Sequence, residues 1–167
     1  MNPVWHVHNG NIPKENNIMS FSMLLNLVET SNADSKDLLW KFVKKYKTNL
    51  NEKEFPIFDK LVDYAIKYYK DVISPNKKYK TPNSDEKKVL MSLVKALDEC
   101  NDKMTPEDIQ TKIFSVGKEN GYKDNLRDWF KLIYEVVFGD ENGPRIGFFI
   151  SFFGVKETQN LIKEKIM

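Results

Sequence analysis

The chain of 167 residues is 41% hydrophobic and 13% aromatic, and it has a formal net charge of +2 at pH 7. This composition excludes a disordered chain and is sufficient for one domain of ordinary size or two small ones. No apolar run approaches the roughly 20 residues that span a bilayer, and no signal peptide is visible at the start, so we expect no membrane partner.

Residues 1–19 are predicted to be an irregular arm. Pro3, Gly10 and Pro13 interrupt regular structure within this segment. Outside the first ten residues there is no alternating apolar pattern of four or more positions, so strands are nearly absent from the prediction.

Residues 20–74 are predicted to form a helical connecting region. Apolar positions at helical spacing, together with capping residues, predict helices that begin after Ser20, after Asp34 or Ser35, and near Glu54. Between residues 41 and 80 there are eleven Lys against five Asp or Glu, a local excess of six positive charges. Such a surface suits a polyanion, although solvated helix faces often have the same composition.

A linker is predicted at residues 74–83, where proline, lysine and asparagine replace the periodic apolar pattern. Ser84, with Lys87 three residues later, is expected to cap the next helix without a full capping box. Further helix starts are expected at Thr105, at Asp124 or Asn125, at Pro144 and near Lys156. The sequence therefore predicts an all-α protein of about eight helices.

The most apolar stretch of the chain follows a polar, glycine-flanked turn at residues 139–145. Pro144 suits the first position of a helix, and Gly154 suits the residue that ends one. Ile146, Phe149, Ile150 and Phe153 fall on one face of this helix, and Phe148 and Phe152 widen that face. A helix that is apolar nearly all round is a buried helix, so the C-terminal part of the chain is expected to pack about it.

Residues typical of an enzyme site are scarce. His6 and His8 have a spacing that suits a metal, but no third ligand lies nearby in the sequence, so no metal site is expected. Cys100 has no neighbours that would lower its pKa, and as the single cysteine it favours a reducing, cytoplasmic setting. There is no phosphate-binding glycine loop and no paired-carboxylate motif, so no catalytic residue is expected in this chain.

Basic and aromatic residues alternate between residues 112 and 145. Lys and Arg neutralise phosphates, while aromatic rings and guanidinium planes stack on unpaired bases. Arg127 and Arg145 are the strongest candidates, since each is expected at a helix start, where a cation gains nothing from the helix dipole. Trp129, Phe130 and Tyr134 could instead be core residues, and for Phe130 and Trp129 the core is favoured. The candidate RNA-binding residues are Lys118, Tyr122, Lys123, Arg127, Trp129, Lys131 and Arg145.

These residues resemble the C-terminal part of class I lysyl-tRNA synthetases. The resemblance is carried by Lys118-Glu-Asn-Gly-Tyr122, Arg127-Asp-Trp-Phe130, Gly139-Asp-Glu-Asn-Gly-Pro-Arg145 and Phe152-Phe-Gly-Val155. Near the start, Asn2-Pro-Val-Trp-His6 and Ser20-Phe-Ser-Met-Leu-Leu-Asn-Leu27 resemble the segment that follows the catalytic domain in bacterial members. The glycine-proline-arginine turn is also found, in looser form, in glutamyl-tRNA synthetases.

The resemblance implies that residues 84–167 form a helix-cage domain that binds the anticodon of lysine tRNA. It also implies a separate catalytic domain, which uses ATP and Mg to attach lysine to the tRNA. That domain's His-x-Gly-His and Lys-Met-Ser-Lys-Ser signatures do not occur here, so this chain alone is expected to be inactive and to hold no cofactor. Two other functions stay open: a helical protein–protein interaction module, and the tRNA-binding end of a glutamate-type synthetase.

Overall fold

The computed structural model describes residues 9–10, 18–31, 35–46, 50, 52–101 and 103–167. Within these ranges every regular element is a helix and there is no strand, which confirms the predicted all-α class with about eight helices. The α-helices are α2 (Phe21–Ser31), α3 (Lys36–Tyr46), α4 (Pro56–Tyr68), α5 (Ser84–Leu97), α6 (Pro106–Gly117), α7 (Leu126–Val137), α8 (Ile146–Phe153) and α9 (Val155–Ile166). None of the described helices is long and apolar enough to cross a membrane.

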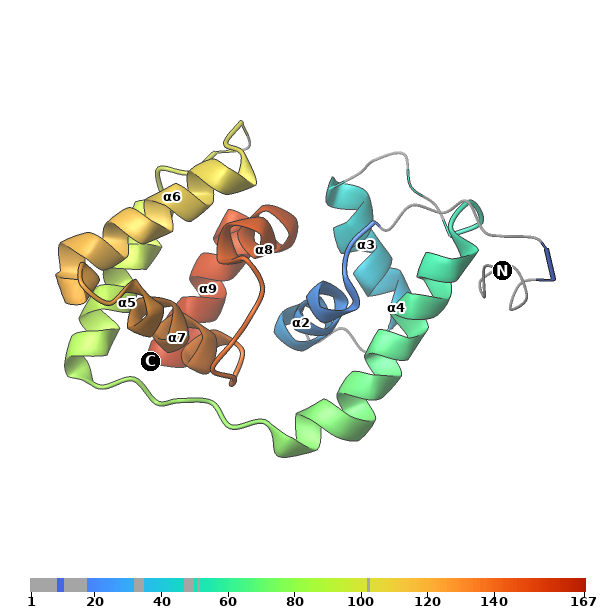
Figure 1. Cartoon of the computed structure of the whole chain (residues 1–167), viewed down its shortest axis with the longest axis horizontal. Helices are drawn as coiled ribbons and strands as arrows, with labels where there is room; N and C mark the ends of the chain where they lie inside the picture. Colours follow the sequence, from blue (N-terminus) through green and yellow to red (C-terminus); the bar gives the residue numbers. More distant parts are fainter. Residues whose placement is uncertain (1–8, 11–17, 32–34, 47–49, 51, 102) are drawn as a thin grey trace.

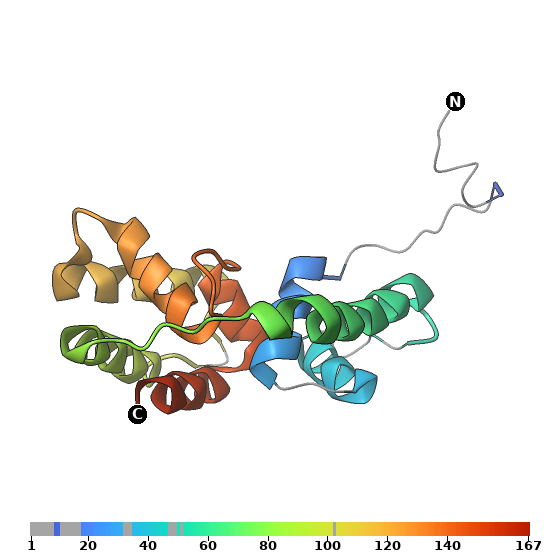
Figure 2. The ribbon, with the colours of Figure 1, turned by 90° about the horizontal axis from the view of Figure 1, so that it is seen from below.

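The helices form two groups that lie side by side (Figure 1). Helices α2 to α4 make up one group, and α5 to α9 make up the other. Seen from below, the two groups form one elongated body with the linker running along it (Figure 2). The groups touch where Phe42 of α3 stacks on Phe153 of α8, with 5.7 Å between ring centroids.

Helix α8 is the packing centre that its sequence predicts. Phe149, Ile150 and Phe152 are completely buried, and Ile146 and Phe153 nearly so. The helix packs on α6, α9, α3 and α2, so it contacts both groups of helices. The apolar side chains on the different faces of α8 are thus buried against different neighbouring helices, as expected for a helix that is apolar nearly all round.

The turn before α8 differs from its prediction. The helix begins at Ile146 with Arg145 as the N-cap, so Pro144 precedes the helix instead of occupying its first position. The carbonyl oxygen of Pro144 accepts a hydrogen bond of 2.8 Å from the hydroxyl of Tyr134. Gly154 ends α8 as predicted, with φ of +112°, and α9 begins at the next residue.

The linker is shorter than predicted, and its end is capped by a different residue. Helix α4 continues as a π-helical turn, Tyr69–Ile73, and a 3-10 turn, Ser74–Asn76, so the extended segment is residues 77–83. Asn83, not Ser84, caps α5, and it forms a full capping box with Glu86. The asparagine side chain accepts from the Glu86 N–H at 2.9 Å, and the Glu86 carboxylate accepts from the Asn83 N–H at 2.9 Å. The residue three positions after Ser84 is Lys87, which cannot complete a capping box. The residue three positions after Asn83 is Glu86, the acid that a capping box requires.

Candidate nucleic-acid interface

Two adjoining depressions lie beside α7: the larger one is between α7 and the loop of residues 139–145, and the smaller one also reaches α6. Their volumes are about 680 Å³ and 420 Å³, and both are lined by Arg127, Phe130 and Tyr134. We refer to them together as the α6–α7 hollow. The smaller depression is further lined by Gln110 and Phe114 from α6 and by Gly143 and Arg145 from the loop. The larger depression is further lined by Asn142 and by three charged residues, Asp128, Lys131 and Glu141.

Three aromatic side chains form one wall of the hollow. Phe130 and Tyr134 are four residues apart on α7, which places them on the same face of the helix, with ring centroids 6.3 Å apart. Phe114 from α6 packs edge-on against Phe130 at 4.8 Å and stays 36% exposed. The wall therefore offers accessible aromatic surface on which a planar group can stack.

The loop lies directly on Tyr134. A Cβ atom at Gly143 would lie 2.5 Å from the Tyr134 ring, so only glycine permits this approach of the backbone. Together with the hydrogen bond from the Tyr134 hydroxyl to Pro144, this contact fixes the ring against the loop. The loop and the aromatic wall consequently form one surface.

Cations flank the aromatic wall. Arg127 lies exposed in the first turn of α7, and Arg145 lies at the start of α8 with 75% of its side chain exposed. The only ion pair that the described residues provide for Arg145 is a long one, 4.0 Å from Glu107. Lys131 is different, because Glu141 lies 2.8 Å from it and Glu135 lies 3.7 Å from it. The two arginines therefore carry the positive charge that is available to a ligand.

The smaller depression presents hydrogen-bond donors. No carboxylate is among its described lining residues, and the donors there are Arg127, Arg145 and the Gln110 amide group. The Tyr134 hydroxyl already donates its proton to the Pro144 carbonyl. The Gln110 carbonyl is occupied, because it accepts the backbone N–H of Gly147 at 2.8 Å and so caps α8 from α6. Phosphate oxygens and the carbonyl oxygens of bases match such donors.

The other predicted RNA-binding residues lie outside the hollow. Lys118 and Lys123 are exposed near the turn between α6 and α7, and they line neither depression. Tyr122 packs against Trp129 with 5.5 Å between ring centroids, and burial raises the pKa of Tyr122. Trp129 itself is completely buried, and its indole N–H donates to the Ile113 carbonyl at 3.0 Å. In this conformation Trp129 is a core residue and offers no face to a base.

The remaining chemical candidates are a pair of histidines and the single cysteine. His6 and His8 lie outside the described residues. Cys100 is partly buried, and this burial raises the pKa of its thiol, which disfavours the reactive thiolate.

Sequence reasoning missed Phe114, Gln110 and Asn142 as lining residues. Phe114 has a recognisable signal, because it follows Ile113 and lies beside the buried stripe of Ile109, Ile113 and Val116. A single exposed apolar residue is common on protein surfaces, so it is the contact of Phe114 with Phe130 in the tertiary structure that makes it part of an aromatic patch. Gln110 and Asn142 carry no comparable signal.

Known proteins that are similar to this chain include several lysine–tRNA ligases. Lysine–tRNA ligase of Rickettsia felis is 39% identical over 166 residues, which are 99% of this chain and 31% of that protein. The corresponding ligases of Rickettsia bellii and Rickettsia peacockii are 38% and 39% identical over the same share of this chain and 32% of theirs. The resemblance to lysyl-tRNA synthetases is thus confirmed over almost the whole chain, which spans about a third of the length of these relatives. No protein-family model and no solved structure matches the chain.

Proposed function

We propose that this chain is the C-terminal, tRNA-binding part of a class I lysine–tRNA ligase, and that the α6–α7 hollow receives unpaired bases of the lysine tRNA anticodon loop. The similarity to lysine–tRNA ligases supports the choice of tRNA. The observation that carries the proposal is the hollow itself, where stacking surface lies between two exposed arginines.

The geometry suits single-stranded RNA. An unstacked base would lie against Phe114, Phe130 or Tyr134, while Arg127 and Arg145 would contact the base edge or the adjoining phosphates. Stacking of one base on an aromatic side chain contributes about 1–3 kcal/mol, and a base-contacting arginine contributes about as much. In a duplex the base faces are covered by their neighbours and could not use this wall.

The chemical step belongs to the rest of the parent protein in this proposal. Lysine–tRNA ligases attach lysine to tRNA at the expense of ATP, and the resemblance assigns ATP and Mg to a catalytic domain whose signatures are missing from this sequence. The role of this chain is to bind the correct tRNA. A sample of this chain alone is expected to bind tRNA without aminoacylating it, in a cytoplasmic setting.

A protein–protein interaction module is the second candidate, and one observation favours it. Ile57, Tyr64, Tyr68 and Val72 recur along the outer side of α4 and its π-helical extension, and each is between 39% and 59% exposed. Exposed apolar strips of this kind often mark contacts with other proteins. The strip lies on a different helix from the hollow, so tRNA binding and a protein contact would not compete for the same residues.

Titration of the chain with purified tRNA separates these functions. We expect lysine tRNA to bind more tightly than glutamate tRNA in a filter-binding assay, because the chain resembles lysine enzymes. We also expect affinity to fall steeply between about 50 and about 200 mM salt, as counterions are released from neutralised phosphates. Equal, weak and salt-independent binding of both tRNAs would support the protein-interaction module, and tighter binding of glutamate tRNA would support the glutamate-type synthetase.

A further inference from the structure

The linker connects the two groups of helices through one buried ion pair. Lys77 Nζ lies 2.9 Å from Glu29 Oε2 of α2, and the two side chains are only 13% and 4% exposed. The same Nζ donates a hydrogen bond to the carbonyl oxygen of Phe138, the residue that caps the C-terminus of α7. A cation at this position also interacts favourably with the negative end of the helix dipole.

The neighbouring contacts hold this ion pair in place. The hydroxyl of Tyr79 donates to the other carboxylate oxygen of Glu29, and Lys165 of α9 lies 3.5 Å from the centre of the Tyr79 ring. Burial raises the pKa of Glu29, while the hydrogen bonds from Tyr79 and Lys77 act in the opposite direction. Glu29 is therefore a buried acid whose charge depends on partners supplied by the linker.

The loop of residues 139–145 begins directly after Phe138, the residue whose carbonyl oxygen accepts the hydrogen bond from Lys77. Gly139 has φ of +59°, and a Cβ atom there would lie 3.3 Å from the Lys78 carbonyl and 3.4 Å from Lys77 Cδ, so the first loop residue packs on the linker. The other end of the loop is tied by Tyr134 to Pro144. Asn142, Gly143 and Arg145, which lie within or just after this tethered segment, line the hollow.

We infer that Glu29 and Lys77 are positioning residues for RNA binding: they anchor the start of the 139–145 loop, and so hold Asn142 and Arg145 where a base in the hollow meets them. This inference rests on the proposed function of the hollow. It assigns a role in RNA affinity to a glutamate of α2 and a lysine of the linker, although neither lines the α6–α7 hollow.

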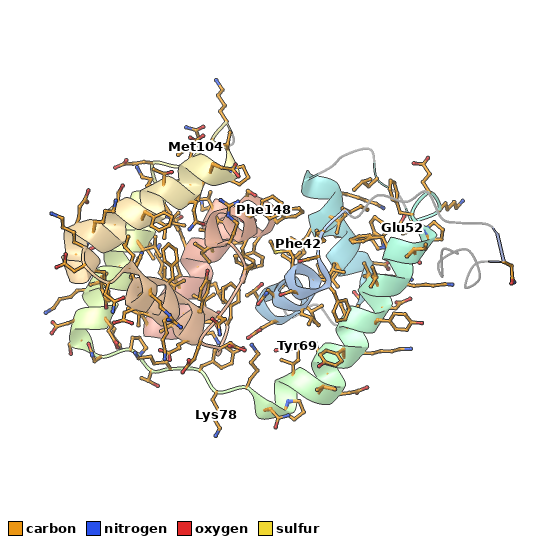
Figure 3. All side chains as sticks on the ribbon, viewed as in Figure 1. Phe42, Glu52, Tyr69, Lys78, Met104 and Phe148 are labelled. Atoms are coloured by element: carbon orange, nitrogen blue, oxygen red, sulfur yellow. The ribbon has the colours of Figure 1, made fainter. Side chains whose placement is uncertain are left out.

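The test uses Lys77→Met, Glu29→Gln and the double variant of the full chain. Lys77→Met alone leaves Glu29 buried without its cation and is expected to destabilise the fold. The double variant replaces both charges by neutral groups, which restores stability without restoring the contact to Phe138. Lys78→Met is the matched control, because Lys78 is the adjacent linker residue and points away from the molecule (Figure 3).

We expect the double variant to bind the anticodon stem–loop of lysine tRNA at least ~5-fold more weakly than the wild type, the lower limit for one lost base contact. Amide hydrogens of residues 139–145 should exchange faster in the double variant, and Lys78→Met should match the wild type in both measurements. Wild-type affinity and wild-type exchange in a folded double variant would overturn the inference. If replacing both Arg127 and Arg145 by alanine also leaves binding unchanged, the hollow is not the RNA site, and the exchange rates alone then decide whether the ion pair anchors the loop.

Discussion

Replacing Gly147 by alanine should lower the free energy of unfolding by ~3 kcal/mol or more, the upper range for overpacking a close-packed core. A Cβ atom at this position would lie 2.3 Å from the Pro106 carbonyl oxygen and 2.7 Å from the Gln110 backbone nitrogen. Both are backbone atoms of α6, so no side-chain rotation relieves the collision. The two helices would have to separate, and the hydrogen bond from Gly147 to Gln110 would be lost.

The sign of the change in the free energy of unfolding for Gly147→Ala distinguishes overpacking from helix propensity. Helix propensity alone predicts that alanine stabilises a helix by about 1 kcal/mol relative to glycine. Urea unfolding followed by circular dichroism distinguishes the two outcomes, with Ser115→Ala on the exposed face of α6 as a control expected to stay within about 0.5 kcal/mol. Stabilisation by Gly147→Ala would show that α6 and α8 do not approach as closely as described.

Replacing Trp129 by alanine should lower the free energy of unfolding by about 3–5 kcal/mol, as for other buried aromatic residues. The Trp129 side chain is completely buried, and its indole N–H satisfies the Ile113 carbonyl of α6. Gly117 faces the indole so closely that a Cβ atom there would lie 2.4 Å from the ring. Removing the indole would therefore leave a cavity between α6 and α7.

Thermal and urea unfolding measure this loss, and Phe114→Ala is the matched control. Phe114 is an aromatic residue of α6 with 36% of its surface exposed, so its removal should cost much less stability. RNA affinity should respond in the reverse order. Phe114→Ala should weaken RNA binding more than Trp129→Ala, because Phe114 lines the hollow and Trp129 does not. A Trp129→Ala variant that is as stable as the wild type, and yet defective in RNA binding, would restore the stacking role that the sequence suggested for Trp129.

The helices were predictable because their signals are local. Thr105 caps α6 at the predicted helix start, where it forms a capping box with Asp108. The apolar spacing of α7 predicts Trp129 and Ile133 on one face of the helix, and both are buried. The errors also have local causes. The cap of α5 was predicted one residue too late, at Ser84 instead of Asn83. The π-helical turn that continues α4 was not predicted, because it has no distinctive sequence pattern.

The hollow was only half predictable. Arg127 and Arg145 were predicted as RNA-binding residues because cations at helix starts are unfavourable without a partner, and both line the smaller depression. Phe130 looked like core, since its packing depends on where α6 places Phe114, and that position is a property of the tertiary structure. Lys131 was also predicted to bind RNA, and its pairing with Glu141, which depends on the path of the loop, could not be predicted.

Calorimetric titration of the lysine tRNA anticodon stem–loop into the chain and its Arg127→Ala, Arg145→Ala double variant tests the binding site most directly. The proposal predicts that the wild type binds the stem–loop and that the folded double variant binds at least ~10-fold more weakly, since a base-contacting arginine contributes about 1–3 kcal/mol. Equal affinity of the two proteins, with unchanged circular dichroism, would contradict the assignment of the α6–α7 hollow as the anticodon site.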